Sequence, residues 1–166
     1  MLTEKDRIRL KAIYDKYNLI PEDVWEDKET FFKIISKDGI RKIRKQLQKE
    51  IPGLWFDLNL EHCVLNHSVV KCTPKIRSGT QDNAYIDVPP TFGEAAPDNS
   101  TFFFPTNVAE KRALSRMILE IADLYAEGFR GEEEMHKLSK KTKIVMDGQG
   151  SVDNAFKKLQ EKKIVK

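Results

Sequence analysis

Histidine and cysteine side chains gather in one short stretch of this chain, where they could bind a metal ion or pair as nucleophile and base. The stretch contains His62, Cys63, His67 and Cys72. Adjacent strand residues point to opposite faces of a sheet, so His62 and Cys63 are not expected to share a metal ion. The sequence offers no third group to orient a cysteine–histidine pair for catalysis. We therefore expect no metal here, but a small pair of buried cysteines and histidines at a turn.

The short motifs of common enzyme classes are missing from the sequence. It contains no P-loop, GxGxxG, HExxH or GxSxG pattern. A nuclease-type D…ExK arrangement is not found either, and the nearest approach, residues 110–112, falls at the start of a predicted helix. We expect a protein that is not an enzyme and that needs no cofactor.

Basic side chains form the remaining candidate site. Segment 33–49 holds seven basic residues against Asp38 alone, and it follows segment 21–30, which holds five acidic residues against Lys28. Cations beside a helix N-terminus suit a phosphate group. The alternative is a solvated helix whose charges are partly matched by the acidic segment. The residues predicted to contact nucleic acid are Lys111, Arg112, Arg116, Lys71, Lys75, Arg41 and Lys45.

Net charge is a poor guide to this pattern. The 166 residues carry 29 basic and 26 acidic side chains, a net charge of +3, but residues 1–130 hold 20 of each. The longest apolar runs span a few residues, against about 20 needed for a bilayer, and the N-terminus lacks a signal-peptide core. Two cysteines without CxxC spacing favour a reducing compartment, so we expect a cytoplasmic protein without a membrane span.

Hydrophobic periodicity predicts the elements that must position these side chains. It indicates an N-terminal helix over 3–19 and a short helical piece over 29–35. A third helix begins at Ser36 or Asp38 and runs to about Glu50.

A change to period two predicts strands after Pro52-Gly53. The first is 55–64 and the second begins at Ser68 and reaches Cys72 or beyond, with Pro74 at an edge or an end. The third is 84–88, interrupted by a Pro-Pro pair and continued over 91–95.

The clearest helix is predicted from Asn107, a good N-cap, to Gly128. Two weaker helices follow, over 131–143 and from Ser151. The fold class is therefore α+β: N-terminal helices, a three-stranded antiparallel β-meander with a long helix packed across it, and a small helical C-terminal tail. We expect one domain over 1–130 and a helical appendage over 131–166.

The junction between sheet and long helix resembles a known family. Its segments read FGEAAPDN at 92–99 and NVAEKRALSR at 107–116. This pattern is similar to that of single-strand DNA annealing proteins, which include phage recombination mediators and the eukaryotic double-strand-break repair annealing protein. The resemblance covers about 36–130.

The resemblance implies an ATP-independent protein that binds single-stranded DNA and pairs complementary strands in phage or mobile-element recombination. It implies a ring or helical homo-oligomer with DNA in a basic groove. Lys111, Arg112 and Arg116 would lie near that groove, Lys71 and Lys75 opposite, and Arg41 and Lys45 in a second row. The alternative is a structural or interaction protein of a phage or mobile element, whose basic helix binds an acidic protein partner.

Overall fold

The computed structural model describes residues 4–27, 30–78, 81–84, 86–100 and 104–135. In this part of the chain the helices are α1 (Glu4–Tyr17), α2 (Lys37–Glu50) and α3 (Pro105–Ile121), with short 3₁₀ turns η1 (Pro21–Asp23) and η2 (Glu132–Met135).

The predicted start and end of α2 are confirmed. Ser36 is the N-cap, and its hydroxyl oxygen accepts the Gly39 N–H at 3.0 Å. Such a bond satisfies one of the amide groups that the first helical turn leaves without a partner. The buried residues Ile40, Ile43 and Leu47 form its predicted apolar stripe.

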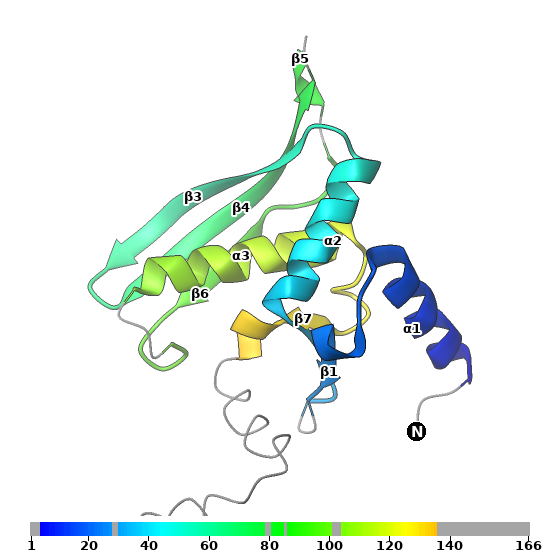
Figure 1. Cartoon of the computed structure of the whole chain (residues 1–166). Coiled ribbons are helices and arrows are strands. Elements are labelled where there is room, and N and C mark those ends of the chain that lie inside the picture. The colour runs from blue at the N-terminus through cyan, green and yellow to red at the C-terminus, as the bar shows by residue number, and fades with distance from the viewer. Residues whose placement is uncertain (1–3, 28–29, 79–80, 85, 101–103, 136–166) are drawn as a thin grey trace, which may run out of the picture.

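The larger sheet is antiparallel and has β4 at its centre. Its strands are β3 (Leu54–Val64), β4 (His67–Ser78), β5 (Gln81–Ala84) and β6 (Thr91–Ala95). β3 pairs with one edge of β4, while β5 and β6 share the other edge (Figure 1). β6 pairs with residues 68–72 and β5 with residues 76–78, so Pro74 falls between them and removes no ladder hydrogen bond there.

The third predicted strand is wrong in its bounds. Ala84 is the last residue of β5, and residues 86–90 are not in a strand. The segment 91–95 forms β6, a separate strand that returns to the same edge of β4. Consecutive prolines cannot donate ladder hydrogen bonds, so the chain leaves the sheet between β5 and β6.

Helix α3 packs across the larger sheet, and the predicted α+β class is confirmed. The helix begins at Pro105 and ends at Ile121, so the predicted start at Asn107 and end at Gly128 are wrong. Gly128 instead takes a left-handed conformation, φ 83°, in the turn that leads to β7 (Phe129–Gly131).

A second, smaller sheet was not predicted. Its strands are β1 (Val24–Glu26), β2 (Lys33–Ile35) and β7, with β2 in the centre, antiparallel to β1 and parallel to β7. The helical piece predicted over 29–35 is therefore wrong, because its last three residues form β2. Three-residue strands carry little periodicity of their own, and the partner strand β7 lies far along the chain.

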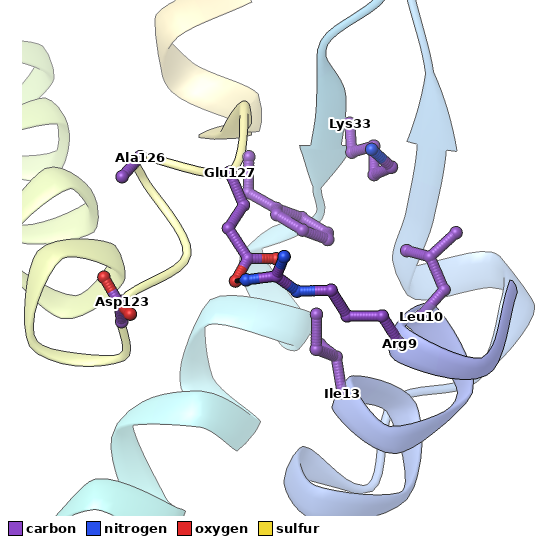
Figure 2. A pocket seen from close by; sticks show the side chains of 8 residues that line it. Arg9, Leu10, Ile13, Lys33, Asp123, Ala126 and Glu127 are labelled. Carbon is purple, nitrogen blue, oxygen red and sulfur yellow. Dashed lines mark hydrogen bonds and ion pairs between the residues drawn. The ribbon is translucent and has the colours of Figure 1, made fainter. Parts of the chain in front are cut away.

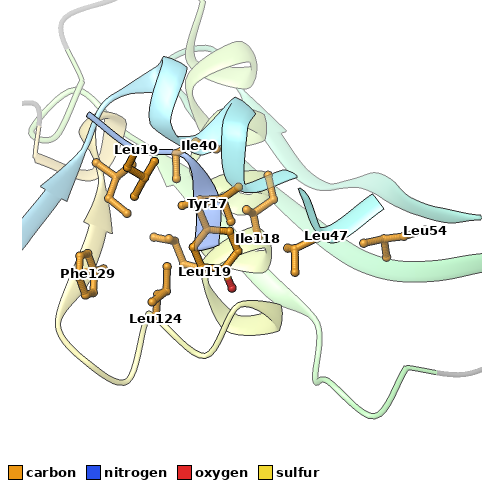
Figure 3. Close-up of a cluster of buried hydrophobic side chains, with 11 residues drawn as sticks. Tyr17, Leu19, Ile40, Leu47, Leu54, Ile118, Leu119, Leu124 and Phe129 are labelled. Atoms are coloured by element: carbon orange, nitrogen blue, oxygen red, sulfur yellow. The ribbon is translucent and has the colours of Figure 1, made fainter. Parts of the chain in front are cut away.

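Two hydrophobic clusters meet at α3. One packs α3 against β4 and β6 through Val70, Cys72, Ala95, Ala109 and Met117. The other packs α3 against α1, α2 and β7, and Figure 3 shows Leu47, Ile118 and Phe129 in it. Since α3 is covered on two sides, the consecutive residues 117–119 are all fully buried.

The chain after α3 returns to the body of the fold. β7 pairs with β2, and η2 contacts α3, so residues 131–135 pack against the preceding elements. The rest of the predicted appendage, 136–166, lies outside the described residues. Among the helices described, none has the length and apolar character needed to cross a membrane.

Candidate nucleic-acid interface

Two of the predicted basic clusters line one pocket. It lies between α2 and α3, has a volume of about 390 Å³, and is called the α2–α3 pocket below. Arg41 comes from α2 and Lys111 from α3. The lining residues are Lys37, Ile40, Arg41, Arg44, Lys111, Leu114, Ser115, Ile118 and Glu133.

Helical spacing explains the row of cations on α2. Lys37, Arg41 and Arg44 follow one another at steps of four and three, which places them on one face of the helix. Ile40 lies beside them and is buried, so this face has an apolar floor below its charged rim. The pocket combines four cations with one carboxylate.

The cations of the pocket are held loosely. The Arg41 guanidinium lies 2.9 Å from Asp38, but both side chains are about three-quarters exposed, at 75% and 74%. An exposed pair of this kind contributes little and exchanges readily for an incoming anion. The Arg44 guanidinium stands 5.4 Å from the centre of the Phe56 ring, a cation–π contact that leaves its charge uncancelled.

Glu133 is the one acidic group in the pocket lining. Its Oε2 atom is buried and has no hydrogen-bond partner in the described part of the chain. Burial raises the pKa of this carboxyl above its ordinary value, although Lys37 and Lys111 act in the opposite direction. Burial therefore makes this carboxyl harder to ionise than an exposed one.

Arg112 was predicted to contact nucleic acid, but its guanidinium faces the protein interior. Its side chain is buried, and burial lowers the pKa of its guanidinium. It donates hydrogen bonds to the backbone carbonyls of Glu94, Asn99 and Glu133, and to the Asn99 side chain at 2.8 Å. Arg112 thus joins α3 to β6, to the following loop and to η2.

Arg116, one turn further along α3, is also engaged. Its Nε atom lies 2.8 Å from the Glu134 carboxylate, and its Nη1 donates to the Phe92 carbonyl. The Glu134 side chain is 7% exposed, so the pair is shielded on the acidic side. Of the three basic residues predicted on α3, Lys111 is the one whose side chain is exposed.

Lys71 and Lys75 lie on the other side of the sheet from α3. Val70 and Cys72 are buried against α3, and neighbouring strand residues point the opposite way. The structure therefore does not place these two lysines across a groove from Lys111. Lys45 is exposed on α2 but does not line the α2–α3 pocket.

The acidic segment neutralises part of α2, as the alternative interpretation expected. The Lys42 ammonium lies 2.6 Å from buried Asp23, on which the Ile20 amide and the Ser36 hydroxyl also converge. Burial alone would raise the pKa of Asp23, but Lys42 and these hydrogen bonds hold it below its ordinary value. Lys42 is thereby removed from the basic face.

Lys37, Arg44 and Glu133 line the pocket but are not among the predicted contact residues. The helical spacing of Lys37 and Arg44 to Arg41 was a usable signal for the two basic residues. Glu133 enters through η2, which follows a non-local strand pairing that the sequence does not show.

His62 and Cys63 point to opposite faces, as expected. The His62 and His67 rings are 5.2 Å apart, and His67 Nε2 lies 2.9 Å from Glu94. Cys72 is buried but Cys63 is exposed, so the prediction of a buried cysteine pair is wrong for Cys63. The described residues contain no group of three or more ligating side chains suited to a metal ion.

A second pocket, of about 410 Å³, lies between α1 and the turn before β7 (Figure 2). Arg9 and Glu127 form an ion pair at this pocket, and Lys33 and Asp123 also line it. Two cations and two carboxylates give it no net charge, so it favours neither sign of ligand. The α2–α3 pocket is the better candidate for an anion.

Comparisons with protein-family models, with curated proteins and with solved structures give no match to this chain.

Proposed function

We propose that this protein binds single-stranded DNA at the α2–α3 pocket and anneals complementary strands without ATP. The proposal places it in the cytoplasm, in phage or mobile-element recombination, as a homo-oligomer that acts by binding alone. The observation that carries it is the meeting of Arg41 and Lys111 at one pocket with Lys37 and Arg44.

The chemistry of the pocket suits a phosphate backbone. Backbone binding needs exposed cations and no base-reading side chains, which is what sequence-independent pairing of strands requires. Four cations per chain bind weakly alone. Several chains in one oligomer bind one strand together and raise its effective affinity.

An acidic protein partner is the second candidate. The apolar floor of Ile40, Leu114 and Ile118 favours it, because an acidic peptide can place an apolar side chain there while its carboxylates meet the cations. A phosphate backbone has no apolar group for this floor. The two candidates therefore differ in the ligand that they place in the pocket, which is a phosphate backbone in one and an acidic peptide in the other.

A salt-dependent titration tests the proposal. Fluorescent single-stranded oligonucleotide is titrated with the full chain at low and at high salt, and an acidic peptide is added as competitor. We expect binding that falls steeply with salt, and faster pairing of complementary strands in the absence of any nucleotide. Absence of binding at low salt contradicts the proposal, and tight binding of the peptide alone supports the second candidate. Gel filtration at micromolar concentration tests whether the protein is a homo-oligomer. Elution as a strict monomer would contradict that part of the proposal.

A further inference from the structure

The larger sheet has one face that α3 covers and one that no described element covers. Buried residues on the covered face of β4 alternate with exposed or half-buried residues on the other. β6 follows the same alternation, with Gly93 and Ala95 buried and Phe92 and Glu94 exposed. The uncovered side is called the open face below.

Aromatic and basic side chains meet on the open face. Trp55 and Lys75 are directly opposite each other on β3 and β4, and the Lys75 ammonium lies 5.2 Å from the Trp55 ring centre. The Arg77 guanidinium, one pleat further, lies 4.9 Å from the same ring. Two cations thus flank one indole that remains partly exposed.

A second aromatic group lies across the sheet. Phe92 on β6 is directly opposite Lys71 on β4 and is 47% exposed. Lys71 and Lys75 are two pleats apart on one strand, about 13 Å at the usual rise. The open face therefore presents two aromatic–cation pairs separated by a distance that a few unstacked nucleotides span.

We infer that the open face is a second binding site for single-stranded nucleic acid, in which unpaired bases stack on Trp55 and Phe92 and phosphates contact Lys71, Lys75 and Arg77. Stacking surfaces interleaved with cations are the chemistry of sequence-tolerant single-strand binding. The inference extends the proposed function to a second strand, but it depends on other residues than the α2–α3 pocket, on the other side of the sheet.

Asp57 reduces the positive charge that the open face offers to a phosphate. Its carboxylate pairs with the Lys75 ammonium, which holds the pKa of Asp57 below its ordinary value against the effect of burial. The Lys75 side chain is 47% exposed, so the pair can open to admit a phosphate. Removing the Asp57 charge frees Lys75 and is expected to strengthen binding.

The intrinsic fluorescence of Trp55 reports on this site directly. The chain has two tryptophans, and Trp25→Phe leaves Trp55 as the only one. Unlabelled oligo(dT) is titrated into the full-length Trp25→Phe protein at low salt. Stacking on Trp55 is expected to quench its emission. Phe92→Ala should lower the affinity that this quenching measures about five- to 150-fold, the usual effect of losing one stacked base. Asp57→Asn should strengthen it.

Charge variants separate the two sites. Lys75→Glu with Arg77→Glu should abolish the quenching, whereas Arg41→Glu with Lys111→Glu should leave it intact. The two double variants make the same change of net charge, so each is the control for the other, and near-ultraviolet circular dichroism checks that each variant is folded.

Each outcome decides between the two sites. Quenching that survives the open-face substitutions, or that only the pocket substitutions remove, overturns the inference and leaves the proposed function standing. Quenching by an acidic peptide but not by oligo(dT) overturns it in favour of a protein partner. The pocket substitutions could also leave both the quenching and the affinity for single-stranded DNA unchanged. That result supports binding at the open face and contradicts the proposed function at the α2–α3 pocket.

Discussion

Arg41 on α2 and Lys111 on α3 line the same pocket, although they belong to different clusters of the sequence. α2 crosses α3 on the side away from the larger sheet, as Figure 1 shows. A ligand bound in this pocket would therefore meet both cations. Their separate contributions to its binding are expected to depend on each other.

Charge reversal at this pair should weaken DNA binding. Arg41→Glu and Lys111→Glu are each expected to lower the affinity for single-stranded DNA about tenfold at low salt, since each removes one charge-assisted hydrogen bond to a phosphate. The dependence of log affinity on log salt should become shallower by about 0.7 for each phosphate that the variant no longer neutralises. Fluorescence anisotropy over a salt series measures both effects.

A control variant distinguishes a specific effect at the pocket from a response to net charge. Lys11→Glu makes the same change of net charge on α1, where the side chain is exposed. It should alter the affinity far less than either pocket variant. Equal losses in all three would show a response to net charge alone and would exclude a specific role of the pocket.

Arg112 is expected to matter for stability. Arg112→Ala removes the donor from several partly buried carbonyl groups, so the free energy of unfolding should fall by about 2–4 kcal/mol. Urea unfolding of the variant measures the loss. Asn99→Ala should reproduce part of it, because the Asn99 side chain also accepts the Ala96 amide at 2.9 Å. A normal unfolding midpoint together with weakened DNA binding would instead assign Arg112 to the ligand.

The junction segments that suggested a family turn out to hold the fold together. Gly93, Asn99 and Arg112 all belong to them, and each makes a contact between α3 and β6 or the loop after β6. Periodicity was sufficient to predict α2, β3 and the packing of a long helix on the sheet. It could not show that Arg112 points inward, because one of its acceptors, the Glu133 carbonyl, is brought to α3 by the non-local pairing of β2 with β7.

Gly93 shows why β6 and α3 can approach closely. A Cβ atom at this position would lie 1.9 Å from the Ala109 carbonyl oxygen and 2.4 Å from the Ala113 nitrogen. Gly93→Ala must therefore push the helix from the sheet, and we expect a loss of about 3 kcal/mol in the free energy of unfolding. Thermal unfolding followed by circular dichroism measures it. Glu94→Ala, on the exposed side of the same strand, should change stability much less.

The smaller sheet marks the limit of prediction from sequence. β2 is three residues long and its parallel partner β7 is about a hundred residues away, so no local pattern encodes the pairing. The pairing brings Glu133 beside α2 and α3. The acidic member of the α2–α3 pocket therefore became visible only with the structure.

Glu133→Gln tests the electrostatics of the pocket. Burial raises the pKa of Glu133 above the ordinary value of 4.5, so the folded state holds this proton more tightly than the unfolded state. The contribution of this group to the free energy of unfolding is therefore complete at low pH. It is lost as the pH rises from about 4.5 through the raised pKa of the folded state. The variant should match the native chain at pH 4 and exceed its stability at pH 8, which urea unfolding over that range measures.

The same substitution removes the negative charge from the pocket and should strengthen DNA binding at neutral pH. Weaker binding would instead indicate that the Glu133 carboxylate accepts a hydrogen bond from the ligand.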